Sequence, residues 1–385
     1  MAFSGRATYS NDTLIGEDVS DLVSTISPFE TPLLDFLGDA TQPATNVLHE
    51  WVEDSLGPGT IATSTAIAST DGSADINIRL EAASDGNALQ TGDILRMVGG
   101  NVIANEELLQ VVTVYGANSL TLSRGFGGVG QSSLVVGGTL ELISNASLEG
   151  ADVSGDISLN RSRQYNFVQQ FQKPIEVSDT QRAVNNLGGI DDEYSYQLEA
   201  RTKEILRDLE KAVILGAASG NSFGSLTAYR SMKGIWRTIA TNQQETTAAL
   251  TESFLGDTIV ASAWDQGGDD VDLIIADSQW KRAIDGLIDS RIRVTDDADT
   301  LRTEVTYYES SFGRQVVLPP NRHMPYKSAM VLASDRIEGV PLQGRSFQHE
   351  SLAKTGHATR GVVVGEYTVA VMNEAGHARG IDTDA

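Results

Sequence analysis

One group of residues that could do chemistry forms a nucleophile-elbow pattern. Residues 220–224 read G-N-S-F-G, and in a serine hydrolase this pattern holds its serine, here Ser222, on a sharp turn between a strand and a helix. Here the pattern follows a predicted helix, and no matching series of an acid and a histidine comes after it. We therefore predict a loop without a catalytic residue, and a serine hydrolase based on Ser222 is the enzyme alternative.

A second pattern matches the dinucleotide-binding fingerprint. Residues 125–130 read G-F-G-G-V-G, but the fingerprint binds a pyrophosphate only where its last glycine opens a helix within a strand-helix-strand unit. The residues after Gly130 are Q-S-S-L-V-V, which do not begin a helix. We predict a β-turn here and no cofactor.

Carboxylates and histidines could bind a metal ion. Residues 269–272 and 296–299 each hold three aspartates, but neither segment has the glycine and terminal glutamate of a calcium loop. The sequence has no cysteine, which excludes disulfides and thiolate metal sites. The histidines are too scattered for their spacing to predict a metal site, although they could converge in space: His49, His323, His349, His357 and His377. We predict solvated loop charges and no metal site.

Composition narrows the class of protein. The chain has 385 residues and a formal net charge of −24, and its length allows about two or three domains. No run approaches the roughly 20 apolar residues of a membrane span, so we expect a protein made in the cytoplasm, with no membrane partner. Between Arg6 and Arg79 there is no lysine or arginine. This segment therefore cannot be a DNA-binding arm, which needs clustered cations.

The sequence also predicts the helices and strands that carry the motifs described above. The clearest is a helix at 191–216, because acidic residues suit its N-terminus and Gly216 can end it. Its predicted apolar stripe is Leu198, Ile205, Leu209, Ala212 and Val213. In the N-terminal arm, short helices are predicted at 18–26 and after Pro32. Residues 77–146 read as short strands between glycine and asparagine turns, which predicts a small inserted β-barrel or sandwich. Mixed helix and strand is predicted beyond the long helix, with strands at 272–276, 315–318 and 361–372 and a helix at 279–291.

Three separated segments together resemble one family. They are I-S-P-F-E-T-P at 26–32 followed by H-E-W at 49–51, the charged helix at 191–216, and Y-E-S-S-F-G at 308–313 running on to L-A-K-T-G at 352–356. In their order and spacing they resemble the major capsid proteins of tailed bacteriophages, over the whole chain except 77–146. The resemblance implies an α+β tailed-phage major capsid fold. Its parts would be an N-terminal arm (1–44), an extended loop with peripheral strands (45–76 and 147–178), the inserted β-domain (77–146), a peripheral domain with a long spine helix (179–220), an axial domain (221–350) and returning strands (351–385).

The resemblance also implies a function and partners. Copies of the chain would assemble as hexamers and pentamers into an icosahedral shell that encloses double-stranded DNA without binding it specifically. The protein would be made in the host bacterial cytoplasm and reside in the virion capsid. Portal, scaffolding and decoration proteins are the other implied partners. Another phage structural protein, of the tail or a decoration protein, is the alternative.

Two groups of residues are expected at subunit contacts. The arm carries more apolar side chains than a short segment can bury on itself, namely Leu22, Val23, Ile26, Leu33 and Phe36. In a shell of acidic subunits, cations are needed opposite the arm's carboxylates, since like charges across an interface repel. The cations expected there are Arg314, Arg322, Arg336, Arg345 and Lys354. Solubility and ion pairs within one subunit are the alternative role for these cations.

Overall fold

The computed structural model describes residues 30–68, 75–82, 85–98, 107–128, 131, 133–150, 152, 156–184, 192–218, 223–267, 271–289 and 307–384. The chain divides into two compact units. We call Met1–Trp51 with Gln164–Ala385 the main unit, and Val52–Arg163 the inserted unit. No helix in the described part is long and apolar enough to cross a membrane.

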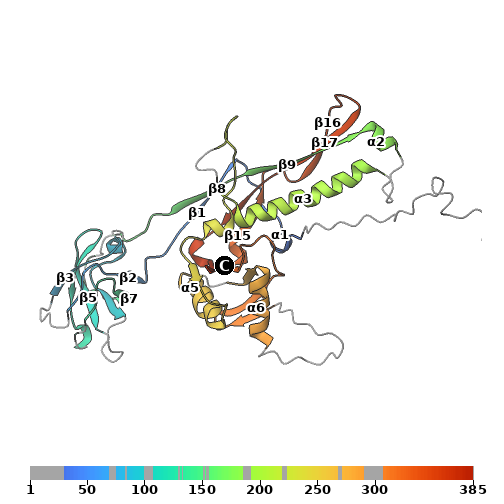
Figure 1. Ribbon diagram of the computed structural model, residues 1–385. Helices are drawn as coiled ribbons and strands as arrows, with labels where there is room; N and C mark the ends of the chain where they lie inside the picture. The colour runs from blue at the N-terminus through green and yellow to red at the C-terminus, as the bar shows by residue number, and fades with distance from the viewer. Residues whose placement is uncertain are drawn as a thin grey trace, which may run out of the picture. The chain divides into compact units, whose positions relative to one another are not determined.

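The main unit contains one long helix, α3 (Glu193–Leu215), which lies along strands β9 (Gln169–Ser178) and β17 (Ala358–Val371) (Figure 1). Asp192 caps its N-terminus by accepting a hydrogen bond from the backbone N–H of Tyr194 at 3.2 Å, and Gly216 follows its last residue. Its 23 residues span ~35 Å at 1.5 Å per residue. The predicted helix at 191–216 is confirmed, and it ends at Gly216, the residue that the sequence indicated as its stop.

The sheet beside α3 is built on β17 (Ala358–Val371), which pairs antiparallel with β9 (Gln169–Ser178) along one edge. Along the other edge it pairs with β15 (Ile337–Pro341) and β16 (Gln348–Leu352). Alternate residues of β9 are buried, and they join apolar residues of α3 in one core that includes Phe171, Ile175, Ile205, Leu209 and Val213. β15 and most of β16, which fall within the segment predicted as the axial domain (221–350), pair in this sheet.

A second, six-stranded sheet completes the main unit. Its order is β10-β18-β14-β11-β13-β12, and the strands are β10 (Gln243–Thr246), β11 (Leu273–Ala276), β12 (Tyr307–Ser310), β13 (Gly313–Val317), β14 (Ser328–Leu332) and β18 (Ala378–Asp382). The central strands β11 and β14 are buried at every residue. Trp280 and Ile284 of α6 (Ser278–Asp289) pack on this sheet with residues of η6 (Phe254–Val260) and α5 (Ala261–Asp265). The predicted strands at 272–276, 315–318 and 361–372 are confirmed, as is the predicted helix at 279–291 up to residue 289, the last one described.

Short elements connect these layers. In the arm, α1 (Pro32–Leu37) has proline in its first turn and ends at Gly38, whose φ is 66°. This confirms the short helix after Pro32, whereas the helix predicted at 18–26 lies outside the described residues. The remaining short elements of the main unit are α2 (Asp179–Ala183), α4 (Ile235–Thr238) and the 3₁₀ turns η7 (Ser334–Arg336) and η8 (Glu374–Gly376).

The inserted unit is a six-stranded antiparallel sheet in the order β2-β7-β4-β5-β6-β3. Backbone bonds from Ser64 N to Arg79 O and from Glu81 N to Ala62 O, both 2.9 Å, join the ends of the two outer strands. The sheet thus closes into a small barrel around a leucine-rich core. The elements are β2 (Thr60–Ala62), β3 (Asp75–Arg79), β4 (Asp93–Val98), β5 (Leu108–Val114), β6 (Ser119–Ser123) and β7 (Thr139–Asn145), with 3₁₀ turns η3 (Asp85–Ala88) and η5 (Phe126–Gly128).

The predicted boundary of this domain at residue 77 differs from the structure. That boundary falls inside β3, and β2, which was assigned to the extended loop, pairs with β7. The segment after β2 also bridges to the barrel at Ile67, opposite Leu134. Apart from Ile61 and Ile67, residues 60–68 are small or polar, and backbone hydrogen bonds hold them to the barrel. Their composition therefore resembles that of a loop. The strands that lead to and from the barrel are β1 (Leu48–Glu53) and β8 (Ser162–Phe167), which pair with each other.

Candidate functional site

The structure describes most of the motif that resembles a nucleotide site but only residues 223–224 of the nucleophile-elbow pattern. Ser222 lies outside the described residues. The glycine pattern at 125–130 contains the 3₁₀ turn Phe126–Gly128, in which Gly127 and Gly128 have φ of 72° and 79°. Glycines in this left-handed region form turns, whereas a pyrophosphate site needs the N-terminus of a helix. The predicted turn is confirmed.

A buried ion pair that the sequence did not reveal supports this turn. Arg124 Nη2 and Nε donate to the two carboxylate oxygens of Glu107 at 2.6 and 2.9 Å, and neither side chain is exposed. The third guanidinium nitrogen, Nη1, donates to the backbone O of Ala68 at 2.6 Å. Glu107 Oε1 also accepts from Gly125 N at 3.1 Å. Because both charges are paired and bonded to backbone, the pair fixes the turn rather than a ligand.

The carboxylates and histidines are used inside the fold. Asp272 accepts from the backbone N–H and the hydroxyl of Ser334 at 2.7 and 2.5 Å, while its neighbours at 268–270 and the cluster at 296–299 lie outside the described residues. His377 is buried, and burial lowers the pKa of its ring. Its Nδ1 accepts from Ala333 N at 3.2 Å. Within the described ranges, no three acids or histidines are grouped closely enough to hold a metal ion.

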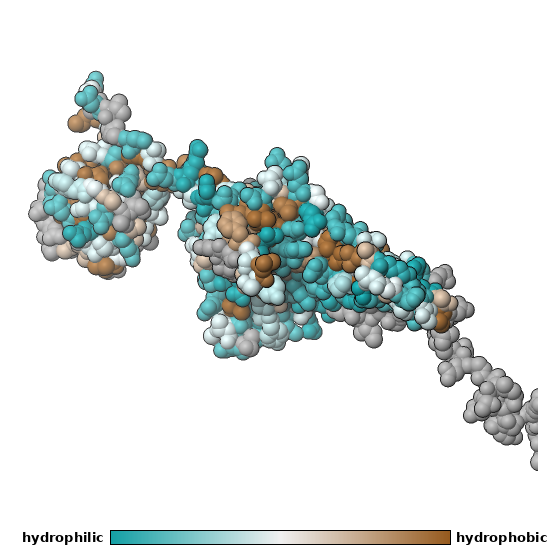
Figure 2. All heavy atoms as spheres, turned by 90° about the horizontal axis from the view of Figure 1, so that it is seen from above, coloured by the Kyte–Doolittle hydropathy of each residue, from teal (hydrophilic) through white to brown (hydrophobic). Residues whose placement is uncertain are grey.

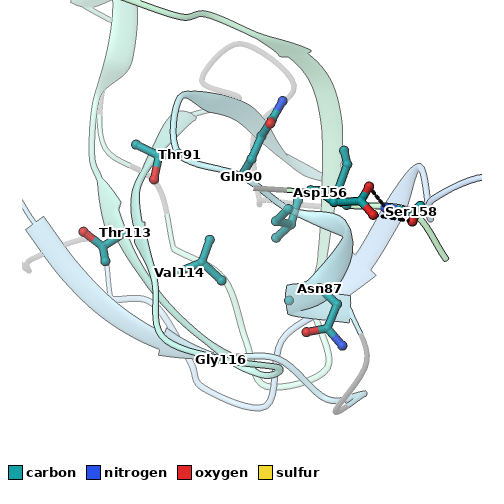
Figure 3. Close-up of a pocket in the computed structure, with 11 residues that line it drawn as sticks. Asn87, Gln90, Thr91, Thr113, Val114, Gly116, Asp156 and Ser158 are labelled. Carbon is teal, nitrogen blue, oxygen red and sulfur yellow. Dashed lines mark hydrogen bonds between the residues drawn. The ribbon is translucent and has the colours of Figure 1, made fainter. Parts of the chain in front are cut away.

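One surface pocket of about 500 Å³ lies in the inserted unit (Figure 3). Neutral polar side chains such as Gln90 and Thr113 line it, together with Asp156. The Asp156 carboxylate accepts two hydrogen bonds from Ser158, one from its backbone N–H at 3.0 Å and one from its hydroxyl at 2.8 Å. These hydrogen bonds lower the pKa of Asp156. The described lining contains no histidine or lysine, and the bond between Asp156 and Ser158 joins residues two apart in sequence, as in a local turn.

The arm residues proposed for subunit contacts divide into two groups. Leu33 is fully buried in the core of its own main unit, so it cannot contact a neighbour. Phe36, one turn further along α1, remains 41% exposed. Leu22, Val23 and Ile26 lie outside the described residues.

Three of the five proposed cations form ion pairs within the subunit. Lys354 contacts Asp179 at 2.5 Å, Arg345 contacts Glu366 at 3.2 Å, and Arg322 contacts Glu30 at 3.3 Å. Arg314 lies over the ring of Tyr307, 3.6 Å from its centroid. Arg336 donates to the backbone O of Gly267 at 3.1 Å. The local roles that the sequence left open therefore account for most of this group.

A residue that sequence reasoning missed is Glu210 on α3, which is fully buried. Its carboxylate accepts from the backbone N–H groups of Leu33 and Leu34 at 3.1 and 3.0 Å, and from Asn321 Nδ2 at 2.6 Å. Burial raises the pKa of Glu210, and these hydrogen bonds oppose that rise. Glu210 therefore joins the arm, α3 and the 321–324 loop at one point. It lies beside Leu209, Val213 and Ile214 in the buried face of α3, but nothing in the sequence indicated that a glutamate on this charged helix would be buried.

Apolar side chains gather in patches on the surface of the main unit (Figure 2). One group lies in the segment that comes after α3 in the sequence, where Leu226 is fully exposed and Tyr229 is 92% exposed. Phe223 in the same segment packs edge-to-face on Phe167 of β8, with ring centroids 5.7 Å apart. Exposed aromatic and leucine side chains of this kind are typical of surfaces that bind another protein.

The fold and these surfaces agree with what the chain is similar to. The family model for the SU10 major capsid protein matches residues 4–384. The chain belongs to this family. Solved structures similar over nearly the full length include the capsid of the native GTA particle, with a TM-score of 0.55 and 10% identity over 97% of this chain and 98% of that one. The capsid of Cyanophage A-1(L) has a TM-score of 0.50 and 10% identity over 99% of this chain and 100% of that one. No curated protein matches the chain significantly in sequence.

Family membership fixes the role of the SU10-family chain as a structural protein of a phage capsid. The similar structures have identities of 10%, so they show the fold alone, and that fold is the predicted α+β tailed-phage major capsid fold. Both predictions from the resemblance, the family and the fold, are confirmed. The tail and decoration alternatives have no support in these comparisons.

Proposed function

We propose that this SU10-family subunit assembles with copies of itself, as hexamers and pentamers, into an icosahedral shell that encloses double-stranded DNA. The observation that carries the proposal is the family match over residues 4–384. The matching fold over nearly the whole length of two capsid proteins supports it.

Exposed apolar side chains are the best candidates for the contacts between subunits. Most of the proposed cations are paired within the chain, so they contribute less to association than unpaired charges would. In contrast, burying Leu226 and Tyr229 against a neighbour would remove apolar area from water, at ~25 cal/mol per Å². Phe36, Leu22, Val23 and Ile26 of the arm are proposed to add contacts of the same kind. Arg314 and Arg336 are the cations that we retain for subunit contacts.

The remaining parts of the proposal concern partners and place. Portal and scaffolding proteins, and decoration proteins where present, are proposed to bind the assembled shell. The subunit would be made in the host cytoplasm, and it would enclose DNA without a specific binding site and without enzymatic activity. Labelling of intact subunits by a serine-reactive fluorophosphonate would contradict the last point.

Electron microscopy of the purified full-length chain tests shell formation directly. We expect closed particles of uniform size. In the variant Leu226→Asp, a charge at the apolar surface should reduce particle yield at least tenfold, while Leu226→Met, which keeps the apolar surface, should assemble normally. Purified wild-type chain that stays monomeric under all conditions, including with a co-expressed scaffolding protein, would argue against self-assembly.

A further inference from the structure

A cluster of basic residues lies beside the arm, at the point where the described chain begins. Arg207 and Lys211 are one turn apart on α3, and Arg322 and His323 follow Asn321, whose side chain bonds to Glu210 of the same helix at 2.6 Å. Burial, and then the positive charges of Lys211, Arg207 and Arg322, lower the pKa of His323. We call Arg207, Lys211, Arg322 and His323 the basic cluster. It stands out in a chain with a net charge of −24.

The carboxylates around this cluster are already in use. Asp208 contacts Lys173 at 2.6 Å and lies 4.0 Å from Arg207. Glu210 accepts three hydrogen bonds from Leu33, Leu34 and Asn321. Exposed Asp35 accepts from the hydroxyl of Thr31 at 3.3 Å, and Glu30 contacts Arg322 at 3.3 Å.

Two cations of the cluster therefore lack a full set of partners. The Nε of Arg207 is buried and has no hydrogen-bond partner in the described part of the chain. Lys211 is exposed, and among the described residues no carboxylate pairs with it. An acidic group that reached this surface could pair with Lys211 and with the exposed part of the Arg207 side chain, which is 26% exposed.

We propose that the basic cluster binds the acidic segment at residues 12–21 of the chain's own N-terminal arm. This segment carries Asp12, Glu17, Asp18 and Asp21, and no lysine or arginine occurs from residue 7 to residue 29. The arm leaves the described structure at Glu30, which already contacts Arg322 of the cluster. Asp21 precedes Glu30 by nine residues, and an extended chain of that length spans up to ~30 Å. Since Glu30 itself contacts Arg322 of the cluster, a segment of that length starts beside the cluster and is long enough to cross Arg207 and Lys211, which lie ~6 Å apart along α3.

Nucleic acid is the other anion that could bind here, and the numbers favour the arm. Affinity for DNA scales with the number of phosphates that a protein neutralises, and this cluster has only three such cations, Arg207, Lys211 and Arg322, because the pKa of His323 is lowered. A segment tethered a few residues away has an effective concentration in the millimolar range. The net charge of −24 repels DNA from the rest of the subunit as well.

The test is cleavage after Glu17 by a glutamate-specific protease, followed as release of fragment 1–17 from unassembled full-length subunits. Because it needs no shell, its outcome is independent of the proposed function. We expect Arg207→Glu with Lys211→Glu to speed this cleavage at least fivefold. The matched control is Arg201→Glu with Lys203→Glu, which makes the same charge change on the same helix. Those two cations already pair with Glu204 and Glu199 at 2.6 Å, so cleavage should stay within twofold of wild type.

A charge exchange makes the assignment specific. Adding Asp18→Lys and Asp21→Lys to the Arg207→Glu, Lys211→Glu variant should restore slow cleavage, whereas the two arm substitutions alone should give fast cleavage. Raising the salt concentration from about 50 mM to about 500 mM should also speed cleavage of the wild-type chain, since salt screens exposed charges. This last measurement needs no variant and therefore does not depend on how the variants fold.

Three results would overturn the proposal. One is wild-type cleavage that neither the cluster substitutions nor salt changes. Another is protection of Glu17 that disappears on tenfold dilution, which would assign the arm to the cluster of a second copy. The third is a variant with Arg207→Glu and Lys211→Glu that binds DNA less than wild type in a filter assay, while its cleavage after Glu17 is as slow as in wild type. That result would make the cluster a phosphate site.

Discussion

Replacing Glu210 by alanine should destabilise the subunit strongly. The substitution removes the acceptor for three hydrogen bonds, from Leu33 N, Leu34 N and Asn321 Nδ2. Each hydrogen bond to a charged acceptor contributes about 1.5–3 kcal/mol. Removing the carboxylate leaves these donors with no partner in a buried site, while it also relieves the cost of burying a charge. We expect a net loss of about 3–4 kcal/mol in the free energy of unfolding.

Glu199→Ala is the matched control for this prediction. Glu199 is also on α3, but it is exposed and pairs only with Lys203 across one turn, and exposed pairs of this kind contribute little. With a urea dependence of about 3 kcal/mol per molar, a loss of 3–4 kcal/mol lowers the urea midpoint by about 1 M. The control midpoint should not move.

Hydrogen exchange locates the effect of the Glu210 substitution. In Glu210→Ala, peptides that cover 30–38 should exchange faster, because the first turn of α1 loses its acceptor, whereas in Glu199→Ala they should exchange as in wild type. If the urea midpoints of the two variants agree within error, the carboxylate does not hold the arm, and this reasoning is refuted.

Four further predictions follow from the same structure. Because burial raises the pKa of Glu210 above its ordinary value of 4.5, the folded state holds this proton more tightly than the unfolded state. The stability of wild type relative to Glu210→Gln should therefore be greatest below pH 4.5 and should fall as pH rises through the raised pKa, measured by urea midpoints across the pH range. Deleting residues 1–28 should give folded subunits that fail to form particles in electron micrographs, whereas deleting 1–40 should also lower the melting temperature because α1 is lost. The isolated inserted unit, 52–163, should melt cooperatively with β-type circular dichroism, whereas 77–146 should not, because it lacks β2 and part of β3. Free subunits should bind double-stranded DNA negligibly in a filter assay at about 50 mM salt, and micromolar affinity with a steep salt dependence would contradict this.

Local signals were enough to predict the elements of the main unit, but not their partners. The long helix is bounded by a capping aspartate, Asp192, and by Gly216, and both act through neighbouring backbone groups. In contrast, β15 and β16 join the sheet of β9 and β17 through long-range pairings with β17, such as those of Ile337 with Val371 and of Ser351 with Gly361. No local pattern encodes such a pairing, so the sequence alone could not show which strands share a sheet.

Glu210 shows why part of the candidate site could not be predicted. On a helix with an acidic first turn and several ion pairs, one more glutamate reads as a solvent-exposed charge. Its burial depends on α1, which supplies two backbone donors from a segment more than 170 residues away in sequence, with separations of 177 and 176. The barrel boundary was missed for a related reason, since Ile61 and Ile67 lie among small polar residues and pair through backbone groups.

The use of cations in this chain changes how its interfaces should be sought. Acidic subunits that associate need positive charge at their contacts, and the sequence suggested Arg322, Arg345 and Lys354 for that role. In the structure these three pair with carboxylates of their own subunit, so a neighbour would have to displace an existing partner. Arg207 and Lys211 are different, because the structure gives them few partners next to an acidic arm. If the arm occupies them, each free subunit is internally neutralised at this point, and exposed apolar surface is what remains to drive assembly.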